Sequence, residues 1–223
     1  MPTSRYERAA RQAGYHGIAG LDEAGRGALF GPVFAAAVVL DPARPIRGLD
    51  DSKLLDAERR EVLAARIKER AAGWAVAAAD AFEIDQINIL QASRLAMKRA
   101  VDRLPVACDY LLVDAVSVDV DLPQEPLIHG DARCFSIAAA SILAKVARDA
   151  ALDRWHQVFP HYNLASNKGY ATPDHREALA TYGPTELHRF SFSPVREACR
   201  RPAWSGYPVY REPSQQGELF ACP

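Results

Sequence analysis

The chain has 223 residues, of which 49% are hydrophobic and 25% are charged, with 27 Lys and Arg against 28 Asp and Glu. This composition is typical of a soluble globular protein with an ample core. No run of about 18 apolar residues occurs, and this excludes a transmembrane helix.

Charged residues are unevenly distributed along the chain. Residues 1–132 hold 16 Lys and Arg against 20 Asp and Glu, whereas residues 133–201 hold 10 against 6 and four of the six histidines. Ordinary scatter on a solvated surface is one interpretation. The other is an acidic, metal-binding half beside a basic half that meets a polyanion.

The first half of the chain alternates strands and helices. A strand over Tyr15–Leu21 runs into a tight turn, and a second strand over Pro32–Leu40 follows, so we expect an antiparallel, hairpin-like start. The next predicted elements are a loop over 41–51, a charged helix from Ser52 or Asp56 to about Arg70, a strand over Trp74–Ala81, a helix over Glu83–Leu104 and a strand over Tyr110–Asp114.

Helices dominate the second half. After a brief strand near Leu127, the pattern predicts a long helix over Ser136–Phe159, whose small apolar first turns require burial against a sheet. Short helices follow at Pro173–Tyr182 and Pro194–Arg201. The sequence thus predicts one α/β domain with a mixed sheet over 1–201 and a flexible tail over 202–223.

Carboxylates end three of these elements. Asp22 and Glu23 follow the first strand, Asp114 ends another, and Asp131 precedes the long helix. Taken singly, Asp22 and Glu23 can be an ordinary acidic pair, Asp114 a turn residue at the end of a strand, and Asp131 a helix cap. Together they favour hard divalent cations, of which two can clamp a phosphodiester. Asp22 and Glu23 can share one site only if their strand ends or bulges there.

A glycine-rich turn, Gly25-Arg26-Gly27, follows the first carboxylates. It is not a dinucleotide fingerprint, because Phe30 stands where a glycine is required and a strand follows rather than a helix. The turn suits close approach of a nucleic-acid backbone or sugar, although a plain turn is also possible.

The order of several short motifs resembles that of bacterial ribonuclease HII, from about Ile18 to Val195. The matching segments are Asp22–Gly27, Gly31–Val33 with Ala35–Val38, Asp51–Lys53, Ile87–Leu90, Gly130–Ala132, Ser136–Val146 with Arg148–Asp149, Lys168–Tyr170 and His188–Val195. The resemblance implies the ribonuclease H fold, a five-stranded mixed sheet flanked by helices, with a helical C-terminal extension. It also implies endonucleolytic hydrolysis of the RNA strand of RNA/DNA hybrids, cutting 5′ of single ribonucleotides in duplex DNA, and hence ribonucleotide excision repair.

The resemblance also implies site residues. Asp22, Glu23, Asp114 and Asp131 match the family's catalytic carboxylates, which hold Mg²⁺ or Mn²⁺ in a two-metal site. Elements that read the ribonucleotide at an RNA–DNA junction correspond to Gly25, Arg26, Gly27 and Tyr170, and Lys53 matches a lysine that we interpret as a phosphate contact. Ala28, Phe30 and Leu54 depart from the expected pattern without touching a presumed metal ligand.

Other residues receive structural interpretations. His156, His161, His175 and His188 show no metal-ligand spacing, so we expect surface, helix or phosphate-contact roles. Two alternatives stay open: another two-metal nuclease of this fold, such as a junction resolvase or DNA exonuclease, and a non-catalytic hybrid-binding module.

The tail carries one further motif, in which Gln216, Leu219 and Phe220 resemble the short peptides that dock bacterial replication and repair proteins on the sliding clamp. Chance remains the alternative. The N-terminal segment lacks the apolar stretch of a secretory signal, and four scattered cysteines suggest neither zinc nor disulfides. We therefore expect a cytoplasmic, monomeric protein that makes no membrane contact.

Overall fold

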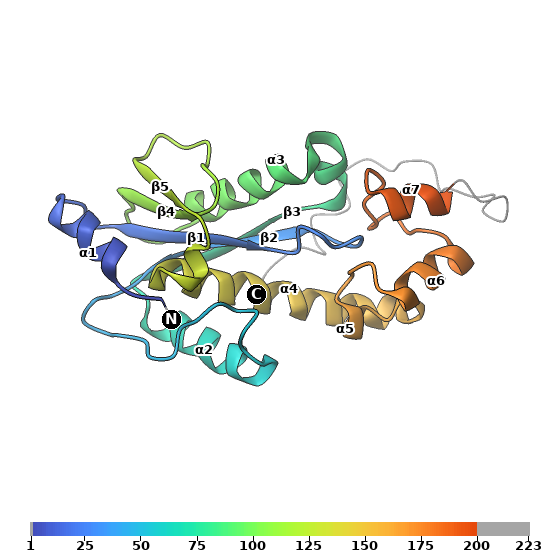
Figure 1. The fold of residues 1–223 in the computed structure, drawn as a ribbon, viewed down its shortest axis with the longest axis horizontal. Coiled ribbons are helices and arrows are strands. Elements are labelled where there is room, and N and C mark those ends of the chain that lie inside the picture. Colours follow the sequence, from blue (N-terminus) through green and yellow to red (C-terminus); the bar gives the residue numbers. More distant parts are fainter. Residues whose placement is uncertain (1, 200–223) are drawn as a thin grey trace.

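The computed structural model describes residues 2–199, which form a five-stranded mixed sheet in the order β3-β2-β1-β4-β5 (Figure 1). The strands are β1 (Ile18–Ala24), β2 (Val33–Val39), β3 (Gly73–Ala79), β4 (Tyr110–Asp114) and β5 (Gln124–Leu127). Strands β1, β2 and β3 are antiparallel neighbours, whereas β4 runs parallel to both β1 and β5. The predicted fold class is confirmed.

Helices cover both faces of the sheet, with α3 on one side and α4 and α2 on the other (Figure 1). The helices are α1 (Arg5–Gln12), α2 (Ala57–Arg70), α3 (Ala81–Asp102), η1 (Gly130–Ala132), α4 (Phe135–Val158), η2 (Pro160–Tyr162), α5 (Leu164–Asn167), α6 (Pro173–Tyr182) and α7 (Ser193–Cys199). None of the helices within residues 2–199 is long and apolar enough to cross a membrane.

The core is built from small residues in the central strands. Alternate residues of β2 face opposite helices, with Ala35 and Ala37 packing on the α3 side and Ala36 and Val38 on the α2 and α4 side. Helix α4 comes so close to β1 that a Cβ on Gly20 would lie 2.1 Å from the Ser136 carbonyl carbon. This close approach brings the start of α4 beside the end of β1.

Helix α4 extends past the sheet, where α5, α6 and α7 gather around its far end (Figure 1). A separate apolar cluster joins them, and it includes Phe30, Leu152, Trp155 and Tyr162. Trp155 is buried, and Phe30, a departure from the family pattern, is fully buried here. The helical C-terminal extension is therefore one packed unit with the loop that follows β1.

Several local predictions need correction. Residues 25–32 form a long connection between β1 and β2 rather than a tight turn, because this segment crosses to the C-terminal helices before returning to the sheet. Helix α3 is interrupted at Asn88, whose φ of 67° is left-handed and whose side chain caps the following turn. Helix α1 was not predicted because its short pattern is mostly polar.

The predicted helix starting at Asp56 is confirmed, since the Asp56 side chain accepts a hydrogen bond from the Arg59 amide and caps α2. The predicted helix Pro194–Arg201 corresponds to α7, which is described as far as Cys199. The tail over 202–223, with its proposed clamp motif, lies outside the described residues.

Candidate active site

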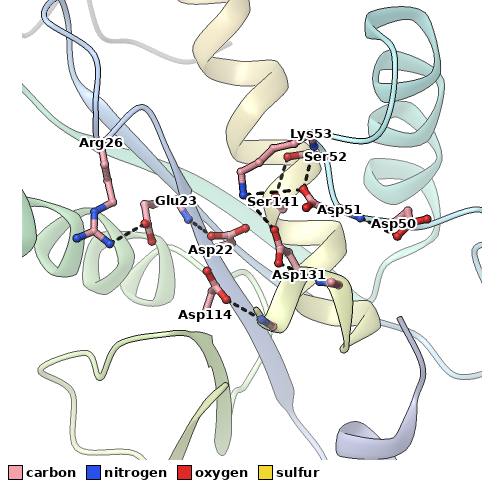
Figure 2. Close-up of polar contacts among 12 residues, drawn as sticks. Asp22, Glu23, Arg26, Asp50, Asp51, Ser52, Lys53, Asp114, Asp131 and Ser141 are labelled. Carbon is pink, nitrogen blue, oxygen red and sulfur yellow. Dashed lines mark hydrogen bonds and ion pairs between the residues drawn. The ribbon is translucent and has the colours of Figure 1, made fainter. Parts of the chain in front are cut away.

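The four predicted carboxylates lie around the end of strand β4, beside the start of helix α4 (Figure 2). The pairing of β1 with β4 ends at Leu21 and Val113, whereas β1 stays paired with β2 as far as Ala24. Asp22 and Glu23 therefore border an open sheet edge without any bulge in β1. We expected their own strand to end; instead the neighbouring strand β4 ends, at Asp114.

Asp131 reaches the same place from η1, the short turn before α4. The backbone amide of Gly130, also in η1, donates to Asp114 Oδ1 at 2.7 Å, and this bond ties η1 to the end of β4. Asp131 is buried, and its Oδ2 lies 3.3 Å from Lys53 Nζ. The loop before α2 thus brings the exposed ammonium of Lys53 to the carboxylates, whereas the sequence analysis expected this lysine to contact a phosphate.

Burial and mutual repulsion dominate the electrostatics of this cluster. Burial raises the pKa of Asp22 well above its usual range, and the charges of Glu23 and Asp114 raise it further. The pKa values of Glu23 and Asp114 are also raised, chiefly by burial, despite Arg26 beside Glu23 and the amide that donates to Asp114. The protein therefore concentrates negative charge that its own cations only partly offset.

The donor set fits a hard divalent cation because all four groups are carboxylates, which is the ligand type that Mg²⁺ and Mn²⁺ prefer. No three His, Cys, Asp or Glu side chains between residues 2 and 199 converge closely enough to hold one ion as they stand. Arg26 lies 3.3 Å from Glu23 Oε1, and Lys53 pairs with Asp131. Rotation of these side chains away from their cationic partners would accompany metal binding.

Ser141 forms a hydrogen bond with Asp22 and is itself paired with Ser52. The hydroxyls of Ser52 and Ser141 lie 2.9 Å apart and are both buried. Ser141 is on α4 and forms a hydrogen bond that lowers the pKa of Asp22, against the larger effect of burial. Ser141 therefore favours the charged form of the Asp22 carboxylate.

The turn Gly25-Arg26-Gly27 leaves the site directly after Glu23. Gly25 has a φ of +99°, and a Cβ there would lie 2.2 Å from Nε of the buried Arg148. A second buried arginine, Arg189, donates from Nη1 to the Arg26 carbonyl at 2.8 Å and from Nε to the Gly31 carbonyl at 2.9 Å. Two internal cations thus hold the turn in place.

Tyr170 borders the same turn from the segment that follows α5. A Cβ on Gly27 would contact the Tyr170 ring at 3.8 Å, and the Arg148 guanidinium carbon lies 5.1 Å from the ring centroid. The Leu29 amide donates to the Gly169 carbonyl at 2.7 Å, which joins the two segments. Tyr170 is 39% exposed, so one face of its ring is available to a ligand.

The structure therefore gathers all nine predicted site residues of the described chain around one stretch of surface: Asp22, Glu23, Gly25, Arg26, Gly27, Lys53, Asp114, Asp131 and Tyr170. Sequence reasoning missed Arg148 and Arg189, whose signal was a positive charge inside otherwise buried segments. It also assigned His175 and His188 to general roles, whereas both are fully buried.

Comparison with known proteins agrees with this geometry. The sequence model of the family "Ribonuclease HII" matches residues 19–195. A ribonuclease HII of Solibacter usitatus is 62% identical over 88% of this chain and 86% of its own length, and one of Koribacter versatilis is 58% identical over 86% and 76%. The ribonuclease HII of Archaeoglobus fulgidus, solved in complex with PCNA, superposes with a TM-score of 0.69 at 26% identity over 82% of this chain and 97% of its own.

Family membership decides between the alternatives that the residues alone left open. The matches extend over most of both chains, and the family model spans residues 19–195, which contain the four carboxylates. Neither a different nuclease of the fold nor a non-catalytic binding module accounts for matches of this extent. The chain belongs to the ribonuclease HII family, whose members are metal-dependent endonucleases that hydrolyse the RNA strand of RNA/DNA hybrids.

Proposed function

We propose that this enzyme also recognises a single ribonucleotide within duplex DNA, cuts on its 5′ side and leaves 3′-hydroxyl and 5′-phosphate ends. The observation that carries the proposal is the position of the Gly25–Gly27 turn, which follows Asp22 and Glu23 in the chain and contacts Tyr170. From this position the turn would contact the sugar next to the bond that is cut. Such an activity would serve ribonucleotide excision repair.

Four carboxylates, on Asp22, Glu23, Asp114 and Asp131, would hold Mg²⁺ or Mn²⁺ in this proposal. When bound, two such ions supply the charge that lowers the pKa of an attacking water and stabilises the departing 3′-oxygen. Lys53 has an exposed side chain beside Asp131, so its ammonium can move from that carboxylate to a substrate phosphate. The hydrogen bond from Ser141 favours the charged form of Asp22, against the larger effect of burial.

The turn and the tyrosine divide the recognition between them. A 2′-hydroxyl donates and accepts hydrogen bonds, so the backbone groups of Gly25–Gly27 can test for its presence. Tyr170 would press its exposed ring face against the sugar of the following deoxynucleotide, where an additional 2′-hydroxyl fits poorly. The two buried arginines hold both elements in register without reaching the substrate themselves.

A duplex with one embedded ribonucleotide tests this function directly. With Mg²⁺ or Mn²⁺ we expect one cut, mapped at single-nucleotide resolution to the 5′ side of the ribonucleotide, and no cut with EDTA. An all-DNA duplex of the same sequence is the matched control. Equal cleavage of that control, or cleavage of continuous hybrids only, would contradict junction recognition.

Tyr170→Ala is expected to lower kcat/KM on the single-ribonucleotide duplex by about a hundredfold, because misplacement of the sugar misaligns the scissile phosphate. Loss on a continuous RNA/DNA hybrid should be smaller, since neighbouring ribonucleotides offer alternative positions. Tyr170→Phe keeps the ring and is the control that should retain selectivity. Equal losses on both substrates in the alanine variant would argue against a junction-reading role.

For the tail we propose docking on the sliding clamp through Gln216, Leu219 and Phe220. The glutamine would bond at the rim of a groove while the leucine and phenylalanine fill an apolar pocket. The Archaeoglobus relative solved with PCNA supports the proposal at the level of the family. Clamp binding by the intact chain should be lost in a chain ending at Ser214 and in Leu219→Ala/Phe220→Ala, but kept in Glu218→Gln. Equal binding by all four would show that the motif is chance.

We further propose that residues 1–201 form the catalytic unit and that the enzyme acts as a cytoplasmic monomer. The described residues form one continuous core around α4, which supports a single unit. Light scattering coupled to size-exclusion chromatography should give a mass near 24.4 kDa, and twice that mass would contradict a monomer.

A further inference from the structure

A buried pair of histidines lies behind Tyr170, away from the carboxylates. His175 is on α6, and His188 is in the segment between α6 and α7. Both side chains are fully buried, and their Nε2 atoms lie 3.1 Å apart. Neither ring has a role in the chemistry described so far.

The partners of the two rings determine where each proton sits. His175 Nδ1 lies 2.9 Å from the Tyr170 carbonyl oxygen, which only accepts, so His175 carries its proton on Nδ1. The backbone amide of Thr185 donates to His188 Nδ1 at 2.9 Å, so His188 carries its proton on Nε2. His188 Nε2–H therefore donates to His175 Nε2, and the neutral pair satisfies every ring nitrogen.

This chain of bonds connects the two elements that would read the junction. At one end it fixes the Tyr170 carbonyl. At the other, His188 forms a backbone bridge with Phe30, whose ring meets the His188 ring edge-on at 4.9 Å between centroids. Phe30 lies in the same connection as the Gly25–Gly27 turn, so the pair spans the distance between that turn and the tyrosine.

We propose that His175 and His188 are positioning residues that hold Tyr170 in register with the Gly25–Gly27 turn, and that only the neutral pair does so. The inference rests on the proposed reading of single ribonucleotides by these two elements. A second proton cannot enter between the rings, because two N–H groups would then face each other across 3.1 Å. Protonation of His175 Nε2 would therefore push the two rings apart and shift the Nδ1–H that donates to the Tyr170 carbonyl.

The surroundings favour the neutral pair. Burial lowers the pKa of His175, although Asp174 opposes this, and burial lowers the pKa of His188 well below its usual range, with His175 and His161 adding to the effect. Tyr162 packs against both rings and donates its hydroxyl to the Gly183 carbonyl, so it offers the histidines no charge.

The first experiment measures kcat/KM for a single-ribonucleotide duplex and for a continuous hybrid between pH 5 and 8, and reports their ratio. Protonation of the carboxylates affects both substrates and cancels in the ratio. For the wild-type enzyme we expect a constant ratio near neutral pH and a fall of about tenfold once the pair is protonated. His188→Leu, which leaves His175 without its partner, should show the lowered ratio at every pH.

Two control variants, His188→Gln and His16→Gln, are measured beside His188→Leu. The glutamine amide can donate to His175 and can also turn its oxygen toward a protonated His175, so the ratio should stay high and independent of pH. His16 is exposed on the opposite end of the sheet, and its variant should behave as the wild type. A His188→Leu variant that folds and keeps the wild-type ratio at all pH values would overturn the proposal.

The second measurement does not depend on activity or on the variants. ¹⁵N NMR of the histidine rings in the wild-type chain should show the proton on Nδ1 of His175 and on Nε2 of His188, with both rings titrating below the usual histidine range. The reverse tautomers, or histidine rings that titrate in the usual range, would overturn the proposed role of the histidine pair and leave the proposed function standing. An enzyme that cuts no embedded ribonucleotide at any pH would overturn the proposed function with it.

Discussion

Asp22 combines burial with two charged neighbours, and this combination has a cost in the folded protein. Its pKa lies well above the usual range because burial and the charges of Glu23 and Asp114 disfavour the carboxylate. Near neutral pH the ionised group therefore opposes folding, whereas a cation bound between the carboxylates would favour it. In the proposed site, the same carboxylate would hold a metal ion and would lower the stability of the metal-free protein.

Asp22→Asn and Asp114→Asn should each abolish cleavage, by more than about a hundredfold, since loss of a group that merely supports a metal ligand already costs 10- to 100-fold. In metal-free buffer Asp22→Asn should raise Tm by about 2–4 °C for each kcal/mol of repulsion removed. Cleavage assays and thermal unfolding with EDTA measure the two effects, with the exposed Asp121→Asn as the control. Turnover at the wild-type rate would remove the residue from the site.

Gly25 and Gly27 have similar places in the sequence but different surroundings. Gly25→Ala combines a left-handed φ with a clash against Arg148, so we expect destabilisation by about 1–3 kcal/mol. Gly27→Ala adds a methyl group at ordinary contact distance from Tyr170 and should change stability by less than about 0.5 kcal/mol. Denaturant unfolding of both variants checks this difference. Equal losses would show that the buried arginine does not restrict the turn.

At the scale of whole elements, helix α1 stabilises the start of helix α4. Its buried Glu7 accepts the Ser136 amide at 2.8 Å and the Cys134 thiol at 3.2 Å, and so caps the helix that follows Asp131. Burial, together with the Glu7 charge, raises the pKa of Cys134 to about 12, so the thiol keeps the proton that it donates. A carboxylate in the first turn of α1 thereby stabilises α4, which borders the candidate active site.

Glu7→Ala should lower the free energy of unfolding by about 1–3 kcal/mol, because a buried amide loses its acceptor. Glu7→Gln keeps an acceptor oxygen and a donor and should lose less. Arg8→Ala, on the exposed side of the same helix, is the control. Urea unfolding of the three variants gives the order, and an equal effect in all three would argue against the cap.

At the scale of the whole molecule, α4 carries the connection between sheet and C-terminal helices. Its first half packs on the sheet near the carboxylates, and its second half joins the cluster that contains Phe30 and Tyr162. The acidic and basic parts of the sequence therefore meet along one helix. This arrangement agrees with a nucleic-acid substrate that spans metal site and C-terminal extension.

The buried histidine pair should make the folded protein sensitive to acid. Folding lowers the pKa values of His175 and His188. Below about pH 6.5 the unfolded chain therefore binds more protons than the folded chain, and the free energy of unfolding decreases as the pH is lowered. Well above that pH both histidines are neutral in the folded and the unfolded chain, so they no longer make the free energy of unfolding depend on pH. Denaturant unfolding in EDTA should show wild type losing about 1 kcal/mol more than His188→Gln between pH 7.5 and 5.5. Equal losses would mean that the pair titrates normally.

Much of the architecture follows from local pattern. The strands, the long small-residue helix and the capped helix α2 obey periodicity and capping rules that act within a few residues. The short, polar helix α1 lacks such a signal. The break in α3 at Asn88 depends on the left-handed backbone of that residue, and no proline nearby indicates it in the sequence. The motifs around Asp22, Asp114 and Asp131 could be picked out because hard cations require several carboxylates.

The sequence by itself determined the fold class, the family and the chemical type of the site. Only the tertiary structure decided which groups face each other: the open edge left by β4, Lys53 on Asp131, the arginines beneath the Gly25–Gly27 turn and the bond between His175 and His188. The physical reason is sequence separation. Local propensities act over a few residues, whereas each of these contacts joins distant segments whose meeting depends on how the whole core packs.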